Sequence, residues 1–382
     1  MKSFLNNLFL LRFLSNFPKV ILIPYFAVWL IHFENFSPAQ AGVIVGSYII
    51  TYRAGALFFS WLTSQHHPKK ILICNLALLG ILQTLLFVLG VYNIHYFLWW
   101  IITSLLLGSA ISIISNLILS YIGSLKDSSQ HVILFSYLNM AFNLSSGIGP
   151  VLGGIILHAF PQYLPLAPCF FIIIALWLSF NLPDLETHER REGQPYGYIK
   201  LFANTSLLKF IIISSISFLG YACFYDLFPL YSHKVYALPT IGLFFLITCF
   251  IIVLFQIPIK KLILERTSKR YALLIAHLLL AASVLLLFFG GKGHIAITLV
   301  GLVCLSFSEM IFLPIYQAQT LILAGPANSV YAMALLSALW GVTEAIAASS
   351  GTYLIAHHFA LPFYISCTIF SVLTAVYFFL TE

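Results

Sequence analysis

Residues 295–323 read IAITLVGLVCLSFSEMIFLPIYQAQTLIL, an almost wholly apolar run in which Glu309 is the one charged residue. A membrane-spanning α-helix needs about 20 consecutive apolar residues, so this run is long enough to cross a bilayer. A charged side chain near the centre of such a helix costs at least about 2.5 kcal/mol. We therefore expect Glu309 to face a polar cavity inside a helix bundle and not the lipid.

The composition of the whole chain agrees with this interpretation. Of the 382 residues, 61% are hydrophobic and 8% are charged, whereas a soluble domain averages about 25% charged residues. A soluble fold of this size could not hide so much apolar surface from water. The net charge of +7 comes from basic residues scattered over short loops, so it does not predict nucleic-acid binding. The sequence predicts an integral membrane protein.

Twelve segments are apolar and long enough to span the membrane, which predicts an all-α fold. Their approximate ranges are 8–31, 39–62, 71–91, 96–121, 132–158, 164–182, 207–230, 241–259, 271–290, 295–323, 330–356 and 362–380.

The loops between these segments alternate in basic charge. Of the 18 lysines and arginines, 14 lie on one side, only Lys234 and Lys292 lie on the other, and Lys19 and Arg53 remain inside the spans. Loops rich in lysine and arginine stay in the cytoplasm. Both termini are therefore predicted to be cytoplasmic, and an even number of spans agrees with that placement.

A charged segment at 183–205 divides the spans into six and six, which predicts an N-terminal bundle at 1–182, a cytoplasmic linker and a C-terminal bundle at 206–382. Similar features recur with an offset of 200 residues: Gly42 and Gly242 each follow a proline at the start of a span. Parallel halves of six helices are a known repeat design of secondary transporters.

Nothing in the sequence indicates catalysis. The six cysteines all fall in apolar segments, without a CxxC pair or a Cys/His cluster, so we expect neither disulfides nor a zinc site. A nucleophile elbow and a phosphate-binding loop are also missing from the sequence, so an enzyme with a transporter-like body is a weak alternative. We expect no cofactor, with a proton gradient as the energy source.

The fifth span contains the string GIGPVLGG, with small or bending residues at Gly147, Gly149, Pro150, Gly153 and Gly154. Glycines let helices approach closely in a membrane, and a proline removes a backbone hydrogen bond and bends the helix. We expect a hinge between the halves here. The string resembles the G-x-G-P-x-x-G-G motif of the drug/proton antiporters in the major facilitator superfamily, which function as exporters in bacterial-type inner (plasma) membranes.

A second resemblance lies in the loop after the eighth span. Residues 262–270 read LILERTSKR, similar to the superfamily pattern G-x-L-x-D-R-x-G-R-K, and Glu265 and Arg266 stand at its acid and arginine. The resemblance implies a gating role for both residues. The first-half copy departs from the pattern, with Ser64 and Gln65 at those positions, and Ser104 stands where the antiporters often carry an arginine.

The resemblance also implies which spans line the central cavity: 1, 2, 4, 5, 7, 8, 10 and 11. The five ionisable residues inside spans, Lys19, Arg53, Asp226, Glu309 and Glu344, all fall on these. Both bases lie in the first half and all three acids in the second. Asp226 lies closer to the end of its span than the other four and is expected to be wet.

We assign roles to these residues on chemical grounds. A carboxyl group in a low-dielectric cavity favours its protonated form, and a nearby cation opposes this. Glu309, Glu344 and Asp226 are therefore candidates for proton coupling, with static ion pairing as the alternative. Lys19 and Arg53 would bind an anionic group of the substrate or pair with the proton carriers. Further residues that we expect to line the substrate site are Asn116, Asn139, Asn143, Gln256, Tyr25 and Trp340.

The sequence thus predicts a monomeric, multi-pass transporter that exports a small anionic or zwitterionic compound, such as a carboxylate metabolite or siderophore, by proton antiport. Its expected partners are this solute, protons and the lipid bilayer. One alternative is a multidrug antiporter for lipophilic cations, and another is uptake by proton symport, because a motif does not fix direction.

Overall fold

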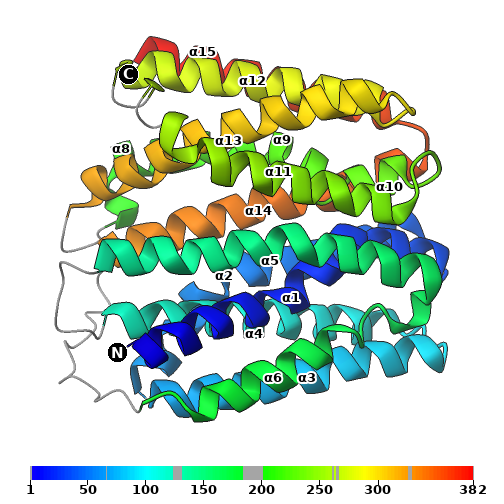
Figure 1. Ribbon diagram of the computed structural model, residues 1–382. Helices are drawn as coiled ribbons and strands as arrows, with labels where there is room; N and C mark the ends of the chain where they lie inside the picture. Colours follow the sequence, from blue (N-terminus) through cyan, green and yellow to red (C-terminus); the bar gives the residue numbers. More distant parts are fainter. Residues whose placement is uncertain are drawn as a thin grey trace.

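The protein is described by a computed structural model that covers residues 2–65, 67–123, 131–183, 201–259, 262–263, 266–325 and 329–381. Regular structure within these ranges is entirely helical, and the long helices lie roughly parallel to one another (Figure 1). The all-α prediction is confirmed.

The described residues of the first half form six α-helices and one short 3-10 turn. They are α1 (Lys2–His32), α2 (Pro38–Gln65), α3 (Pro68–Val91), α4 (Phe97–Gly123), α5 (His131–Ala159), η2 (Pro161–Tyr163) and α6 (Pro168–Phe180).

The described residues from 205 to 381 contain eight α-helices, three of which share one span. They are α8 (Thr205–Ser215), α9 (Ser217–Tyr225), α10 (Phe228–Ser232), α11 (Leu238–Ile259), α12 (Lys269–Gly290), α13 (Ile295–Ala324), α14 (Ser329–Ala356) and α15 (Ala360–Thr381).

Eleven helical stretches within the described residues are long and apolar enough to cross a membrane. The 28-residue helix α2 completes the twelve that the sequence predicts. The seventh of these spans is broken into α8, α9 and α10, and the sequence explains the second break. Pro229 lacks an N–H and would clash with the carbonyl of Tyr225 in a continuous helix. The chain turns instead at Asp226 and Leu227, whose N–H groups both donate to the carbonyl of Ala222.

The helices of the first and second halves occupy different parts of the molecule (Figure 1). We propose that they form the two six-helix bundles, 1–182 and 206–382, that the sequence predicts. Most of the linker between them lies outside the described residues. Both chain termini lie at the same end of the molecule (Figure 1), which we call the terminal end, and the opposite end is the far end.

The most extensive contacts between the halves are those of α5 with α11 and of α2 with α14, and we call these contacts the α5–α11 seam and the α2–α14 seam. The predicted hinge string lies in the first. Cβ atoms added at Gly147 and Gly154 would meet α11, whereas added Cβ atoms at Gly149 and Gly153 would meet α1. Helix α5 is therefore packed closely on two sides, against its own half and against the other.

The α2–α14 seam uses glycine in the same way. A Cβ atom at Gly42 or Gly46 would collide with Ser349 of α14, and the Ser349 hydroxyl donates to the Gly42 carbonyl at 2.8 Å. Gly242, the repeat partner of Gly42 in the sequence, faces the backbone of Pro150 across the other seam. Gly42 at one seam and Gly242 at the other thus play equivalent roles, since each lets a backbone of the opposite half approach closely.

The halves also meet close to the far end. The Tyr25 hydroxyl lies 2.8 Å from the carbonyl oxygen of Pro150 in its own half and 3.2 Å from that of Leu238 in the other. The His32 and His233 rings lie 4.6 Å apart across the same boundary. Burial lowers the pKa of His233, helped by His32 and Lys234 and opposed by the Leu230 carbonyl. An uncharged ring can approach His32 without repulsion.

We expect Gly154→Ala and Gly242→Ala to lower the thermal unfolding midpoint of the purified protein. Each added methyl group would collide with a backbone carbonyl across the α5–α11 seam, and overpacking costs about 1–3 kcal/mol. Gly80→Ala is the matched control, because the nearest atom to its added Cβ would lie 3.6 Å away. Equal midpoints for all three variants would contradict the role given to the seam glycines.

Candidate functional site

A central cavity lies between the two halves. It is lined by residues of α1, α2 and α5 from the first half and of α9, α11, α13 and α14 from the second. Four of the five predicted charges line it: Lys19, Asp226, Glu309 and Glu344. The expectation that ionisable residues converge on a shared cavity therefore matches the geometry.

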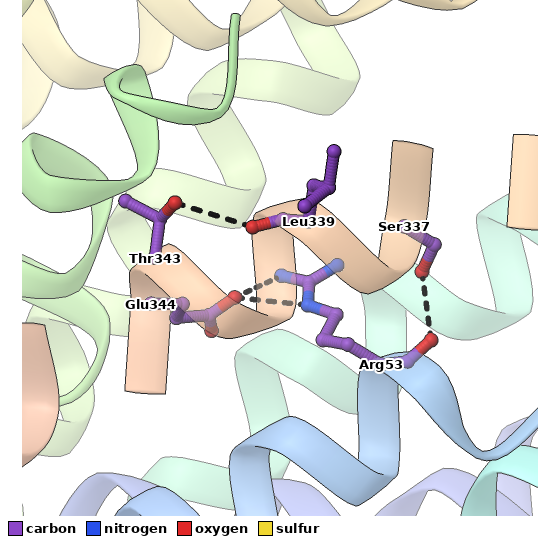
Figure 2. A network of polar contacts seen from close by, with 5 residues as sticks. All are labelled: Arg53, Ser337, Leu339, Thr343 and Glu344. Atoms are coloured by element: carbon purple, nitrogen blue, oxygen red, sulfur yellow. Dashed lines mark hydrogen bonds and ion pairs between the residues drawn. The ribbon is translucent and has the colours of Figure 1, made fainter. Parts of the chain in front are cut away.

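The fifth charge, Arg53, joins the two halves. Figure 2 shows its side chain reaching from α2 to the Glu344 carboxylate on α14. Its Nη2 lies 2.7 Å and its Nε 2.9 Å from the same oxygen, Oε2. The Arg53 and Glu344 side chains are only 16% and 7% exposed. This is the one ion pair found among the described residues.

One face of α14 is shaped to receive Arg53. Ser337, Gly341 and Glu344 recur at helical spacing and so share a face. The Ser337 hydroxyl donates to the Arg53 carbonyl at 3.1 Å (Figure 2). A side chain at Gly341 would collide with the Cβ of Arg53. The α2–α14 seam therefore depends on the small residue at Gly341 as well as on the ion pair.

Aromatic rings cover the rest of the Arg53 guanidinium. Its Cζ lies 5.3 Å from the ring centre of Phe218 and 5.6 Å from that of Tyr52. Trp340 stacks on Phe218 with a centroid separation of 4.5 Å. Trp340, which we predicted to line the substrate site, is thus one ring removed from Arg53 and is not among the residues that line the cavity.

Lys19 reaches the cavity from α1. Its ammonium nitrogen lies 4.0 Å from the ring centre of Tyr52 and 5.7 Å from that of Phe142. Such contacts stabilise a cation by about 0.5–2 kcal/mol. Lys19 forms no ion pair with a carboxylate among the described residues. Its positive charge therefore remains available to a ligand.

Glu309 faces Lys19 and Arg53 from α13. It accepts a hydrogen bond of 2.8 Å from the Tyr225 hydroxyl, and it interacts electrostatically with both bases and with Glu344. The Tyr225 ring stacks on Tyr221 at 4.1 Å between centroids. Tyr225 therefore holds the Glu309 carboxylate in place. Glu309 forms no ion pair among the described residues.

Asp226 corrects one expectation. We expected it to be wet because it lies near the end of its span, but it is 3% exposed and lines the central cavity. The break before Pro229 explains the difference, because it places the carboxylate at the C-terminus of α9. Its Oδ2 atom is buried and has no hydrogen-bond partner within the described structure.

The predicted polar residues divide into two groups. Asn143 lines the cavity, and Asn139 is exposed one turn away on the same helix. Asn116 is exposed and donates to the Ser112 carbonyl of its own helix. Gln256 is half-buried and is not among the cavity-lining residues, nor is Tyr25, which lies near the far end.

The predicted gate residues can be compared only in part. Glu265 lies outside the described residues, and Arg266 is exposed in the turn before α12. The hinge residues are better defined, since Pro150 lines the cavity and its carbonyl accepts from Tyr25. The roles of Glu265 and Arg266 stay predictions.

Sequence reasoning missed two features of this region. The first is Tyr52, whose ring contacts both bases; its position next to Arg53 was the available signal. The second is a buried cluster in the second half. Ser217 lies 2.9 Å from His277 Nε2 and 2.8 Å from the Tyr316 hydroxyl, and these two are 2.6 Å apart. His277 lies on α12, a helix we had set aside as outward-facing.

The sequence matches the family model of the Major Facilitator Superfamily over residues 8–332. The chain belongs to the major facilitator superfamily. It is therefore a transporter and not an enzyme. No curated protein sequence matches it significantly. Membership fits the paired helical halves and the cavity between them.

Solved transporter structures share the fold at low sequence identity. A mutant of the nucleoside transporter NupG is 12% identical with a TM-score of 0.84, each chain covering 98% of the other. A D-xylose–proton symporter is 15% identical with a TM-score of 0.80, covering 98% of this chain and 96% of that one. A POT family transporter in complex with 5-aminolevulinic acid is 14% identical with a TM-score of 0.77, at 98% and 95% coverage.

A double-mutant cycle tests the ion pair of this superfamily member. We expect Arg53→Gln and Glu344→Gln each to lower the free energy of unfolding by about 3 kcal/mol, because each leaves a buried charge unpaired. The double variant should lose clearly less than the sum of the two. Equilibrium unfolding in detergent provides the measurement. Arg53→Gln combined with Glu309→Gln is the control, for which a smaller coupling is expected; additive losses for Arg53 and Glu344 would contradict the pairing.

Proposed function

We propose that this protein is a proton-coupled secondary transporter that exports a small anionic or zwitterionic compound by antiport. The observation that carries the proposal is the Arg53–Glu344 ion pair, which joins the two halves beside a cavity that holds further carboxylates.

The ion pair gives a proton a means to act on the conformation. Glu344 has a negative charge to offer Arg53 only when it is ionised. A proton on Glu344 removes the counter-charge of Arg53 and weakens the α2–α14 seam, since an unpaired buried charge is costly. Movement of the two halves around a central site is how transporters of this design alternate their access. Protonation and the separation of the halves are thereby coupled.

Glu309 is the second proposed proton carrier. It forms no ion pair among the described residues, so it can gain or lose a proton without first breaking one. It is also close enough to Arg53 and Lys19 to interact with both. A change in its charge therefore alters the attraction between the bases of the first half and the acids of the second.

The direction of transport rests on different grounds. The GIGPVLGG string of α5 resembles that of drug/proton antiporters, which favours export. A D-xylose–proton symporter with a TM-score of 0.80 shares the fold, so proton-symport uptake is the second candidate. We also propose that the terminal end faces the cytoplasm of a bacterial-type cell, because the basic loops predict it. The far-end contacts of Tyr25 and His32 would then close the periplasmic side.

Transport by reconstituted protein tests the proton carriers. Purified protein in proteoliposomes with an imposed pH gradient is exposed to amino acids, polycarboxylates and lipophilic cations, and a pH-sensitive dye reports proton flux. We expect Glu309→Gln or Glu344→Gln to lower the gradient-driven flux at least tenfold. Each amide keeps the shape of the side chain and loses its ability to bind or release a proton.

Glu34→Gln is the matched control for these variants. Glu34 is a described carboxylate that lies beside Gly90 and His95 and outside the cavity, so its variant should retain the flux. Full gradient-driven flux in both Glu309→Gln and Glu344→Gln would rule out both as carriers. Flux with lipophilic cations alone would favour a multidrug antiporter, and the direction of proton movement separates antiport from symport.

A further inference from the structure

The cavity charges are not equally available to a solute. Arg53 and Glu344 satisfy each other at 2.7 Å, and Glu309 accepts a hydrogen bond from Tyr225. Lys19, Asp226 and Glu309 form no ion pair among the described residues, and of the two carboxylates only Asp226 has a buried oxygen without a hydrogen-bond partner there. Lys19 and Asp226 are close enough to interact electrostatically. A solute in the cavity therefore meets, from opposite halves, a cation and a carboxylate that are not bound in an ion pair.

The total charge of the site restricts the charge of the solute. Lys19, Arg53, Asp226, Glu309 and Glu344 together carry a net charge of −1 when all five are ionised, and one coupling proton brings the sum of these five to zero. Net charge is costly to bury at low dielectric. A solute with no net charge keeps the proton-loaded site neutral, whereas a monoanion or monocation leaves one uncompensated charge.

We propose that the transported compound is a small zwitterion whose carboxylate binds Lys19, whose ammonium group binds Asp226 and whose apolar part lies against the aromatic wall of the cavity. This inference rests on the proposed transport function and narrows its substrate class. An amino acid with an apolar side chain is the simplest compound of this kind.

Asp226 has the features of an ammonium site. The carboxylate is 3% exposed, lines the cavity and has an unpartnered Oδ2, so a donor is needed to satisfy it. It also stands directly after Tyr225, the last residue of the nine-residue helix α9. The C-terminus of a helix carries a partial negative charge that stabilises cations. Both effects favour a positively charged group at this point.

Lys19 has the corresponding features of a carboxylate site. Its ammonium group is held over the Tyr52 ring at 4.0 Å, which positions it without neutralising it. Asn143 of α5 lines the same cavity, and its side-chain amide is a possible second donor for a carboxylate. The first half therefore recognises the negative group and the second half the positive one.

Part of the cavity wall is aromatic. Six aromatic residues line it: Tyr48, Tyr52, Phe142, Tyr221, Tyr225 and Phe245. Aromatic side chains offer large apolar contact surfaces and also attract an ammonium group to the faces of their rings. This wall suits a solute with an apolar side chain better than a polyhydroxylated one.

Compounds that differ only in charge test the proposal. L-phenylalanine is compared with phenethylamine, which lacks its carboxylate, and with 3-phenylpropionate, which lacks its amine. L-leucine, isoamylamine and 4-methylpentanoate form a second set with a smaller apolar part. Equilibrium binding to the purified full chain in detergent is measured without a proton gradient. We expect the zwitterion of at least one set to bind at least tenfold more tightly than both of its singly charged analogues.

Two variants assign each end of the zwitterion. Lys19→Met should abolish the preference for the zwitterion over the amine, because the carboxylate loses its partner. Asp226→Asn should abolish the preference over the carboxylate analogue, because the ammonium group loses its partner. Lys234→Met, which removes an exposed lysine outside the central cavity, should preserve both preferences. If a residue only supported the fold, its substitution would weaken the binding of all three compounds equally.

Three results would overturn the proposal: in neither set a zwitterion that binds at least tenfold more tightly than both of its analogues, no binding by either set, or a Lys19→Met or Asp226→Asn variant that changes all three affinities alike. These outcomes are distinct from failure of the proposed function, which is read from gradient-driven flux in Glu309→Gln and Glu344→Gln. Proton-coupled flux of a lipophilic cation, for example, would contradict the proposed zwitterionic substrate and leave the proposed proton coupling intact.

Discussion

A charge buried inside a membrane protein is costly unless it is paired, and the contact between α2 and α14 depends on how Arg53 is paired. The guanidinium crosses from α2 to the Glu344 carboxylate at 2.7 Å, which holds these helices together while the pair is intact. Close approach in turn requires the small Gly341 opposite Arg53, and Ser337 adds a hydrogen bond to its backbone. With Arg53 neutralised, Lys19 is the base that lines the cavity without an ion pair among the described residues. One ion pair thus sets both the packing of a seam and the chemistry of the site.

Much of this arrangement could be predicted from the sequence, because a charged side chain in an apolar span avoids lipid and faces the interior of the protein. The cost of exposing Glu309 or Glu344 to lipid is enough to direct both into a shared cavity. The rotation of a helix about its axis is harder to predict without a charge to fix it, and Asn116 and Gln256 accordingly do not line the cavity. Asp226 was misjudged for another reason: distance along a span measures depth only in a continuous helix, and this span is broken.

For the glycines of α5, some properties follow from the local sequence and others depend on distant parts of the chain. Their small size can be read from the sequence, so the close packing of α5 was predictable; its role as a hinge stays a prediction. Which neighbour each glycine faces depends on the other half of the chain, and no local pattern contains that. Tyr25 is the clearest example, since its hydroxyl reaches carbonyls of both halves. It was predicted to bind substrate; it does not line the cavity, and it joins the two halves near the far end.

The two seams differ in what holds them together. The α2–α14 seam contains the ion pair, whereas the described contacts of the α5–α11 seam are glycines packed against backbone and apolar side chains. A change in protonation can loosen the first and has no charged pair to act on in the second. When the halves move apart, they should therefore rotate about the α5–α11 seam. Helices α2 and α14 should separate, because their contact depends on the ion pair. The mechanical asymmetry of this transporter would then originate in a single pair of charges.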